Sequence, residues 1–473
     1  MMANAMSAGN KLSFYIPKPR SGAKLFPPKK QSHPEAFIKG NFEVTLSAPF
    51  GAKAPLALSK EISRVSLLSA ALECGYGGPA HWTSSLMLDP TQCAELGTYL
   101  GSRLDLLLTS IERVGQIWQP RSFYRKVEPS EKVALSFILG GIGAYLAAQA
   151  WLGAGGTSIK SFLHVGIYTK SSARASPLVS FALKSGKSPD FLVEGHHHGW
   201  HVFEAKGGQN TKRWARLCEG LAQLNALPPI GWSTGGSLYR AVTCVCVHTS
   251  IDPGEGVSIT AVDPPSTDYD PDAPFLILEG VSQLLLMLEA IQQFNALSSD
   301  TPSNNDSLPE WTLSKATVAE GITIGIPSSL FNAEQTIRGR LAVFLAVREF
   351  IERSPSRPSK QPFRTRLRRA VRERMRRDAA DATFFRLDEQ SLTATLQQFP
   401  DVFVPEEFLG ACAKILGLDS LAHNLALHEE QRSLVTSITG AEGIITSGGL
   451  LLLDTSSSQS DDEILKEPST FRG

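Results

Sequence analysis

The sequence predicts an α/β (α+β) fold, in which a mixed β-sheet is flanked by helices and carries additional, mostly helical N- and C-terminal regions. Two apolar runs rich in strand-forming residues, 162–168 and 239–248, predict buried strands. Between them, residues 211–227 place apolar side chains at helical spacing, which predicts a helix packed on the sheet. Of the 473 residues, 42% are hydrophobic and 19% are charged, which is typical of a soluble globular protein. The length predicts about two to four domains.

Residues 1–36 are rich in Pro, Lys, Ser and Gly, and they predict a flexible N-terminal arm. The first twenty residues lack the continuous apolar core of a signal peptide. Residues 37–128 form a predicted helical N-terminal region. Its apolar side chains recur at helical spacing in two stretches, at Ile62, Val65, Leu68 and Leu72, and at Leu104, Leu107, Ile111 and Val114.

An uncharged segment runs from Val133 to Ile159. It is long enough to span a bilayer, so one interpretation is a membrane-tethered protein anchored by residues 133–152. Several glycines and one glutamine make the segment only moderately hydrophobic, and glycines interrupt it at 153–156. We therefore predict that residues 133–152 form a core helix packed on the sheet, with no membrane partner.

The stretch 189–208, PDFLVEGHHHGWHVFEAKGG, carries the clearest chemical signature in the chain. Asp190 opens a short apolar run, a turn follows, and a second apolar run carries Glu204, Ala205 and Lys206. Because successive strand residues point to opposite faces, Glu204 and Lys206 share one face and Ala205 points to the other. Two carboxylates and a lysine on adjacent strands can hold a divalent cation and a water for phosphodiester hydrolysis. The alternative is a surface hairpin in which polar and apolar residues simply alternate.

This pattern resembles the motif of the PD-(D/E)xK nuclease superfamily, with Asp190, Glu204 and Lys206 at the motif positions. The resemblance covers about residues 129–250, where the predicted helix, strand, acidic hairpin, helix and strand follow the order of the family core. It implies a restriction-endonuclease-like core and Mg²⁺ or Mn²⁺ as the cofactor. Asp190, Glu204 and the Ala205 carbonyl would bind the metal, and Lys206 would orient the attacking water or stabilise developing charge.

Two further positions match looser features of the resemblance. Glu131 opens the helix before the first core strand, where many members carry an acidic residue near the metal. The alternative is a helix-start carboxylate that interacts favourably with the helix dipole. Gln223 lies on the helix after the lysine, where some members place a glutamine near the cleft, and the alternative is an ordinary exposed polar side chain.

Histidines occupy positions 196–198 and 201, next to the motif. The first three are consecutive and lie between two glycines, so they predict a tight turn in preference to a zinc site. The six cysteines are scattered along the chain, and Cys244 and Cys246 share one face of a predicted core strand. Buried thiols in a reducing cytoplasm are the expectation.

Residues 251–453 form a predicted, mostly helical C-terminal region. Within it, residues 252–274 predict a long loop with one short strand, and residues 275–297 predict a helix. Residues 454–473 are acidic and rich in serine, which predicts a disordered tail.

The chain has 46 Lys and Arg against 46 Asp and Glu, so any basic surface must be local. Residues 353–377 hold eleven Lys or Arg and one acid. Residues 363–377 predict a helix whose cationic face contacts a phosphate backbone. The alternative is a solvated amphipathic helix with Phe363, Leu367, Val371 and Met375 packed inward. The candidate nucleic-acid ligands are Arg364, Arg366, Arg368, Arg369 and Arg372, together with Lys212, Arg213 and Arg216 just beyond the motif lysine.

The motif and its resemblance predict a metal-dependent nuclease that hydrolyses phosphodiester bonds, with DNA as the expected substrate. By analogy alone, the architecture resembles prokaryotic restriction or phage-defence effectors. The sequence contains no G-x-x-x-x-G-K-[ST] loop, so a protein partner would have to supply any ATPase or targeting function. The alternative is a non-catalytic nuclease-fold scaffold subunit of a larger nucleic-acid-processing or defence complex. A cytoplasmic location is expected, and oligomeric assembly stays open.

Overall fold

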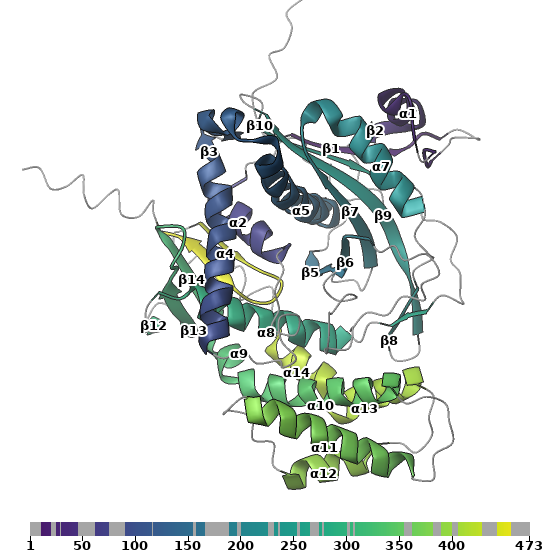
Figure 1. The fold of residues 1–473 in the computed structure, drawn as a ribbon, viewed down its shortest axis with the longest axis vertical. Helices are drawn as coiled ribbons and strands as arrows, with labels where there is room; N and C mark the ends of the chain where they lie inside the picture. Colours follow the sequence, from purple (N-terminus) through teal and green to yellow (C-terminus); the bar gives the residue numbers. More distant parts are fainter. Residues whose placement is uncertain are drawn as a thin grey trace, which may run out of the picture.

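In the computed structural model, the chain forms a large mixed sheet flanked by helices, a second smaller sheet and a layer of C-terminal helices (Figure 1). The predicted α/β class, with a mixed sheet between helices, is confirmed. The structure describes residues 11–19, 25–28, 30–45, 62–74, 90–115, 117–154, 158–165, 189–195, 200–225, 231–234, 237–252, 256–264, 274–276, 279–299, 303–305, 308–353, 362–381, 389–399, 405–427 and 442–455.

The central sheet has nine strands in this described part of the chain. Seven follow the order β2 (Phe42–Thr45), β1 (Lys11–Pro17), β10 (Gly256–Val262), β9 (Ser237–Asp252), β7 (Trp200–Gly207), β6 (Phe191–Gly195) and β5 (Ile159–His164). β7 is parallel to β9 and β1 is parallel to β10, whereas the other neighbours are antiparallel. The short strands β8 (Gly231–Thr234) and β11 (Pro274–Leu276) extend the sheet from β9.

The predicted elements around the motif are present with shifted bounds. The strand predicted at 239–248 is part of β9, and the helix predicted at 211–227 is α7 (Arg213–Asn225) after a 3-10 turn, η2 (Asn210–Lys212). The strand predicted at 162–168 begins and ends earlier, as β5, and residues 166–168 lie outside the described residues.

The prediction of a flexible N-terminal arm is wrong for residues 11–17, which form β1 inside the central sheet. Residues 34–36 of that predicted arm belong to helix α1 (Pro34–Asn41). Leu12 and Phe14 of β1 are buried, and the Phe14 ring centroid lies 4.9 Å from that of Trp151. The Lys- and Pro-rich composition of this segment did not indicate a strand. The partner strand β10 lies far along the sequence, so no local pattern predicted the pairing. The sheet therefore extends beyond the predicted 129–250 core.

Helix α5 (Pro129–Ala154) packs on one face of the central sheet, where it crosses β7 and β9, and α7 packs on the other face (Figure 1). Glycines allow both close approaches. A Cβ added at Gly207 would overlap the Ser136 carbonyl oxygen, and one added at Gly143 would overlap the Thr249 hydroxyl. On the opposite face, a Cβ at Gly220 would overlap the sulfur of Cys246.

Among the described residues, α5 is the one helix long and apolar enough to cross a membrane. Inside the protein, 67% of its apolar window is buried, so the predicted packing of residues 133–152 on the sheet is confirmed. The first turns of α5 differ from the rest, since Val133 is 66% exposed and Phe137 is 57% exposed.

The N-terminal helical region contains α2 (Arg64–Glu73) and α4 (Pro90–Ser110). The predicted second helix extends too far, because Ile111 and Val114 belong to β3 (Ile111–Val114). β3 forms a hairpin with β4 (Ile117–Pro120), and Gly115 has a φ of 62°, a conformation that favours glycine. The 3-10 turn η1 (Ser122–Lys126) then leads toward α5.

The C-terminal region contains more β structure than predicted. A second sheet has the order β12 (Ser303–Asn305), β13 (Leu308–Lys315), β14 (Ile322–Pro327), β16 (Leu451–Asp454) and β15 (Glu442–Ile445). Asp454, predicted to begin the disordered tail, ends β16, and residues 456–473 lie outside the described residues. The short strand predicted within 252–274 is present as β10, which belongs to the central sheet. The helices are α8 (Glu279–Leu297), α9 (Ser328–Asn332), α10 (Glu334–Arg353), α11 (Phe363–Asp381), α12 (Glu389–Gln397), α13 (Pro405–Ile415) and α14 (Leu418–Leu425).

Candidate active site

The candidate site forms where β7 extends past the first residue of β6. The pairing of these strands reaches Phe191↔Phe203, and Asp190 directly precedes β6, so the same antiparallel register sets it opposite Glu204. The Asp190 carboxylate accepts a hydrogen bond from the Ala205 N–H at 2.9 Å. Because a strand residue directs its N–H and C=O to the same neighbour, the Ala205 carbonyl also faces the side of Asp190. A side-chain carboxylate and a backbone carbonyl therefore meet at this edge.

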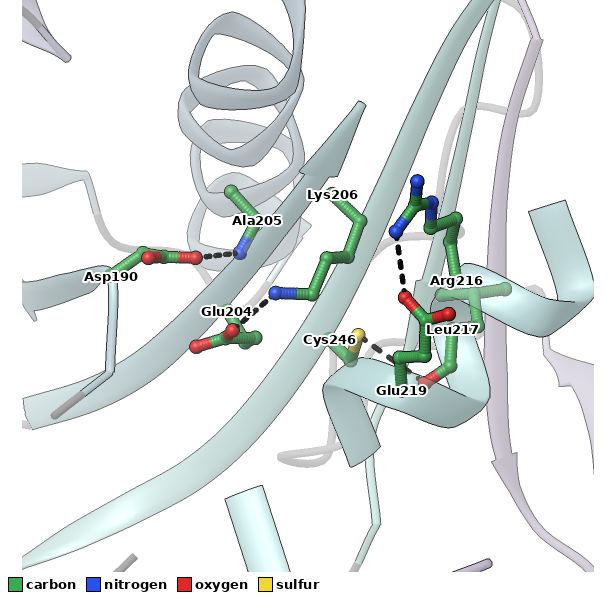
Figure 2. A network of polar contacts seen from close by, with 8 residues as sticks. All are labelled: Asp190, Glu204, Ala205, Lys206, Arg216, Leu217, Glu219 and Cys246. Atoms are coloured by element: carbon green, nitrogen blue, oxygen red, sulfur yellow. Dashed lines mark hydrogen bonds and ion pairs between the residues drawn. The ribbon is translucent and has the colours of Figure 1, made fainter. Parts of the chain in front are cut away.

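Glu204 and Lys206 lie on the α7 face of β7, in agreement with the predicted alternation. Lys206 Nζ donates a hydrogen bond to Glu204 Oε1 at 2.5 Å (Figure 2). Glu204 is only 3% exposed. Gly220 of α7 lies against both side chains, since a Cβ there would be 3.4 Å from Glu204 Cγ and 3.5 Å from Lys206 Cε. An alanine at this position would contact both side chains without overlap, whereas it would overlap the sulfur of Cys246.

Burial raises the pKa values of both carboxylic acids, and the charge of Asp190 adds to the rise at Glu204. Desolvation is the largest cause for Glu204, the charge of Asp190 adds to it, and the pKa reaches about 7 although Lys206 opposes the shift. Desolvation also raises the pKa of Asp190, against the charge of Lys206 and the bond from Ala205. Burial alone would lower the pKa of Lys206, but Glu204 and Asp190 raise it overall. Two acids therefore share one lysine in a buried place, and a divalent cation would relieve their repulsion.

The donor set fits a hard cation. Carboxylate and carbonyl oxygens are the ligands that Mg²⁺ and Mn²⁺ accept, and Mg²⁺ usually takes one or two carboxylates with waters and a substrate phosphate. Asp190, Glu204 and the Ala205 carbonyl match this description. Larger clusters are absent: within the described residues, no group of three or more His, Cys, Asp and Glu side chains is arranged to hold a metal.

A cavity of about 710 Å³ lies beside this cluster, between α5 and the neighbouring ends of β5, β6, β7 and β9. Asp190, Ala205 and Lys206 line the cavity, and Glu204 does not. In a chain with no net charge, cations predominate on this wall, which favours an anionic ligand. The charged lining consists of six cationic side chains, Arg103, Arg125, Lys132, Lys206, Lys212 and Arg216, and two acidic ones, Asp190 and Asp252.

The two looser candidates are placed differently from the cluster. Glu131 is exposed in the first turn of α5 and does not line the cavity, so the structure supports its interpretation as a helix-start carboxylate. Gln223 lies three residues beyond Gly220 on α7 and is half-buried, not exposed. Its Oε1 is buried without a hydrogen-bond partner in the part of the chain that the structure describes, and it also does not line the cavity.

The three cations beyond the motif lysine divide into two groups. Lys212 and Arg216 line the cavity, and Arg216 also pairs with Glu219 at 2.8 Å (Figure 2). Arg213 does not line the cavity and stacks over the Trp214 ring, with 4.3 Å between the guanidinium carbon and the ring centroid.

Helix α11 carries the second predicted basic surface, and Figure 1 shows it among the C-terminal helices, away from α5 and β7. Leu367 and Val371 are buried and Phe363 is half-buried, as the amphipathic interpretation requires. The Met375 side chain lies outside the described residues. The helix packs against α10, so its apolar face belongs to the C-terminal core.

Three of the α11 candidates make bonds within the protein, and one of these bonds joins Arg369 to Glu373 on α11 itself, at 3.0 Å. Arg364 donates to the carbonyl of Phe399 at 2.8 Å, and Arg372 donates to the Thr393 hydroxyl at 2.8 Å. Both arginines therefore hold α11 to the segment around α12. Arg366, Arg368 and Arg369 keep partial or full exposure.

Comparison with known proteins identifies no family for this chain. No protein-family model, curated protein or solved structure matches it.

Sequence reasoning missed His248, which pairs with Lys206 across the β7–β9 ladder. His248 is fully buried, and neither ring nitrogen has a hydrogen-bond partner within the described residues. Burial, and then the charges of Arg213 and Arg216, lower the pKa of His248 to about 4, so its ring is neutral at neutral pH. The signal was available, because His248 continues the alternation of Cys244 and Cys246 on the same face of β9.

The remaining predictions concern the histidines near the motif and the six cysteines. His201 is not a turn residue, since it lies buried in β7, its Nδ1 is 3.0 Å from the Thr243 hydroxyl, and burial lowers its pKa to about 4. Residues 196–198 lie outside the described residues. All six cysteines are free thiols, and most of them are buried, as expected.

Proposed function

We propose that the protein is a metal-dependent nuclease that hydrolyses phosphodiester bonds, with DNA as its substrate. The observation that supports this most directly is that Asp190 and Lys206 line a cation-rich cavity while Lys206 also bonds the buried Glu204 beside it. The same proposal includes a restriction-endonuclease-like core, because the motif resembles that of the PD-(D/E)xK nuclease superfamily. The free thiols suit a reducing compartment, so we place the protein in the cytoplasm.

Each residue has a distinct part in the proposed chemistry. Asp190 and Glu204, with the Ala205 carbonyl, would hold Mg²⁺ or Mn²⁺, which polarises a phosphoryl group and acidifies a bound water. The Ala205 N–H fixes the orientation of the Asp190 carboxylate. Lys206 is among the residues that line the cavity, and its ammonium group, bonded to Glu204, would stabilise charge that develops on the phosphate. The surrounding cations attract the phosphate backbone.

Cleavage of plasmid DNA and of single-stranded DNA and RNA with Mg²⁺ or Mn²⁺, compared with EDTA, tests the proposal. We expect Glu204→Gln and Lys206→Ala to lower the cleavage rate at least about 100-fold, the range for losing a positioned catalytic group. Binding of the DNA in EDTA should stay within about twofold for Glu204→Gln, because that residue does not line the cavity.

The exposed Glu35–Lys39 pair is a matched control, since it has the same 2.5 Å separation as the buried pair. Glu35→Gln and Lys39→Ala should leave the cleavage rate unchanged. If the wild-type protein cleaves neither DNA nor RNA with either metal, the nuclease proposal is wrong. Retained nucleic-acid binding in that case would support the non-catalytic scaffold.

A further inference from the structure

Exposed apolar and cationic side chains border the cavity along α5 and η1. Val133 and Phe137 lie one helical turn apart, are 66% and 57% exposed, and both line the cavity. Beside them, Lys132 Nζ lies 5.6 Å from the centroid of the Tyr124 ring, and these two residues also line it. Single exposed apolar residues are common, but a neighbouring pair at the rim of a pocket marks a binding surface.

The opposite side of the lining supplies further positive charge. Lys206, Lys212 and Arg216 come from β7, η2 and α7, whereas Lys132 comes from α5. Aromatic rings beside a positively charged path are the arrangement by which proteins bind unpaired nucleic-acid strands. The bases stack on the rings, and the cations follow the phosphates.

The size of the cavity selects between paired and unpaired strands. Its volume of about 710 Å³ falls within the range of about 300–1,000 Å³ that is typical of pockets for one small ligand. Such a pocket admits a nucleotide and its neighbours but not a double helix. A base can also stack on a protein ring only after it has left its own stack, as in single strands and flipped bases.

We infer that this cavity binds an unpaired nucleic-acid strand, with a base stacked on Phe137 and phosphates held by Lys132, Lys212 and Arg216. The inference rests on the proposed function, because it specifies the substrate of the same site. It narrows that substrate to single strands or the unpaired ends of duplexes. It concerns binding alone and needs no metal.

Fluorescence anisotropy in EDTA tests the inference without cleavage. A labelled single strand of mixed sequence is compared with the same strand annealed to its complement, and the sequence is tested as DNA and as RNA. We expect the single strand to bind at least tenfold more tightly than the duplex. The DNA and RNA measurements show which sugar the cavity prefers. Equal or tighter binding of the duplex would overturn the inference.

Variants at position 137 test the stacking contact. Phe137→Ala should weaken single-strand binding by about fivefold to 150-fold, the range for one stacked base. Phe137→Leu should bind the single strand as weakly as Phe137→Ala, because leucine is apolar but has no ring on which a base can stack. Phe137→Trp should bind within about twofold of the wild type. Leu106→Ala on α4 is the control, since Leu106 is 38% exposed and does not line the cavity. Wild-type affinity in Phe137→Ala would contradict the proposed contact.

The two proposals can fail separately. Tight single-strand binding that depends on Phe137, without cleavage in Mg²⁺ or Mn²⁺, would remove the nuclease and leave the binding site. Cleavage of duplex DNA that is lost in Lys206→Ala but unaffected by Phe137→Ala would keep the nuclease and remove the single-strand site.

Discussion

Two Glu–Lys pairs in this protein have the same N···O separation of 2.5 Å, but the pKa of the glutamate shifts in opposite directions. Glu35 is exposed, and the hydrogen bond from Lys39 lowers its pKa. Glu204 is buried beside Asp190, and its pKa rises to about 7. Since the partner is a lysine in both pairs, burial and the second carboxylate decide the direction. Perturbed acids in a cleft are candidates for function, which is why the buried pair matters.

Replacing Glu204 should change how stability depends on pH. The pKa of Glu204 is about 7 in the folded protein against its ordinary value of 4.5, so the folded state keeps a proton that the unfolded chain releases in this window. The free energy of unfolding should therefore fall as pH rises from 4.5 to about 7, by at most roughly 1.4 kcal/mol per pH unit from this group. Glu204→Gln should flatten that fall in urea denaturation series, whereas Glu35→Gln should not. Parallel curves for wild type and Glu204→Gln would contradict the assignment.

Metal binding should compete with the same proton. Because carboxylate ligands must be deprotonated, Mg²⁺ should raise the thermal unfolding midpoint more at about pH 8 than at about pH 6, on either side of the Glu204 pKa. Differential scanning fluorimetry with and without Mg²⁺ measures this shift. Glu204→Gln should lose most of the shift, and Glu35→Gln should keep it. An equal shift at both pH values would show that Mg²⁺ binds elsewhere.

At the scale of elements, helix α5 both supports the sheet and borders the cavity. Its middle turns pack on β7 and β9, and its first turns expose Val133 and Phe137 beside the cavity. The approach of α5 to β9 depends on Gly143, because a Cβ there would overlap the Thr249 side chain. The residue at position 143 therefore determines how closely α5 packs on the sheet and where its first turns lie beside the cavity.

Two alanine substitutions on α5 should have opposite effects on stability. Gly143→Ala should destabilise the protein by about 1–3 kcal/mol, the range for an overpacked core. Gly153→Ala should stabilise it by about 0.5–1 kcal/mol, since nothing lies within 4 Å of the added methyl group and alanine favours a helix. Urea denaturation measures both changes. A neutral Gly143→Ala would mean that α5 moves away from the sheet at little cost.

Strand β1 makes a second test at this scale, because residues 11–17 looked like part of a flexible arm. Phe14 is fully buried against Trp151, so Phe14→Ala should lower the free energy of unfolding by about 3–5 kcal/mol. Ser13→Ala, on the other face of the strand, should change it by less than about 0.5 kcal/mol. A Phe14→Ala protein as stable as wild type would show that β1 is dispensable.

At the scale of the whole molecule, positive charge gathers at two places in a chain of zero net charge. One is the cavity, and the other is α11, where three of the predicted arginines make hydrogen bonds within the protein. The two surfaces would act differently. The cavity holds a strand near the candidate catalytic residues, and α11 would add phosphate contacts that do not depend on sequence.

The dependence of binding on salt should separate the two surfaces. Lys212→Gln with Arg216→Gln should lower the slope of log K against log salt by about 0.7 per lost contact on single strands. Arg368→Gln with Arg369→Gln should weaken binding to all sequences alike and lower the slope by about 0.9 per contact on duplex DNA. Anisotropy titrations over a salt series measure both. An unchanged slope for the α11 variant would mean that this helix is structural or faces a protein partner.

The sequence alone determined the elements whose pattern is local. Helical spacing predicted α7, an uncharged run predicted the buried helix α5, and the period of two predicted the shared face of Glu204 and Lys206. These patterns are readable because a regular helix or strand repeats its buried face at a fixed interval. The same patterns did not predict the second sheet, whose strands β14 and β16 pair across more than a hundred residues.

Only the tertiary structure decided which distant segments meet. It placed β1 beside β10, set Asp190 against the Ala205 N–H, and left Glu131 exposed in the first turn of α5. It also built the cavity, since the lining comes from α4, β4, η1, α5, β5, β6, β7, η2, α7 and β9. The physical reason is that periodicity specifies the face that a segment buries, whereas hydrogen bonding and close packing between remote segments select the partner against which it is buried.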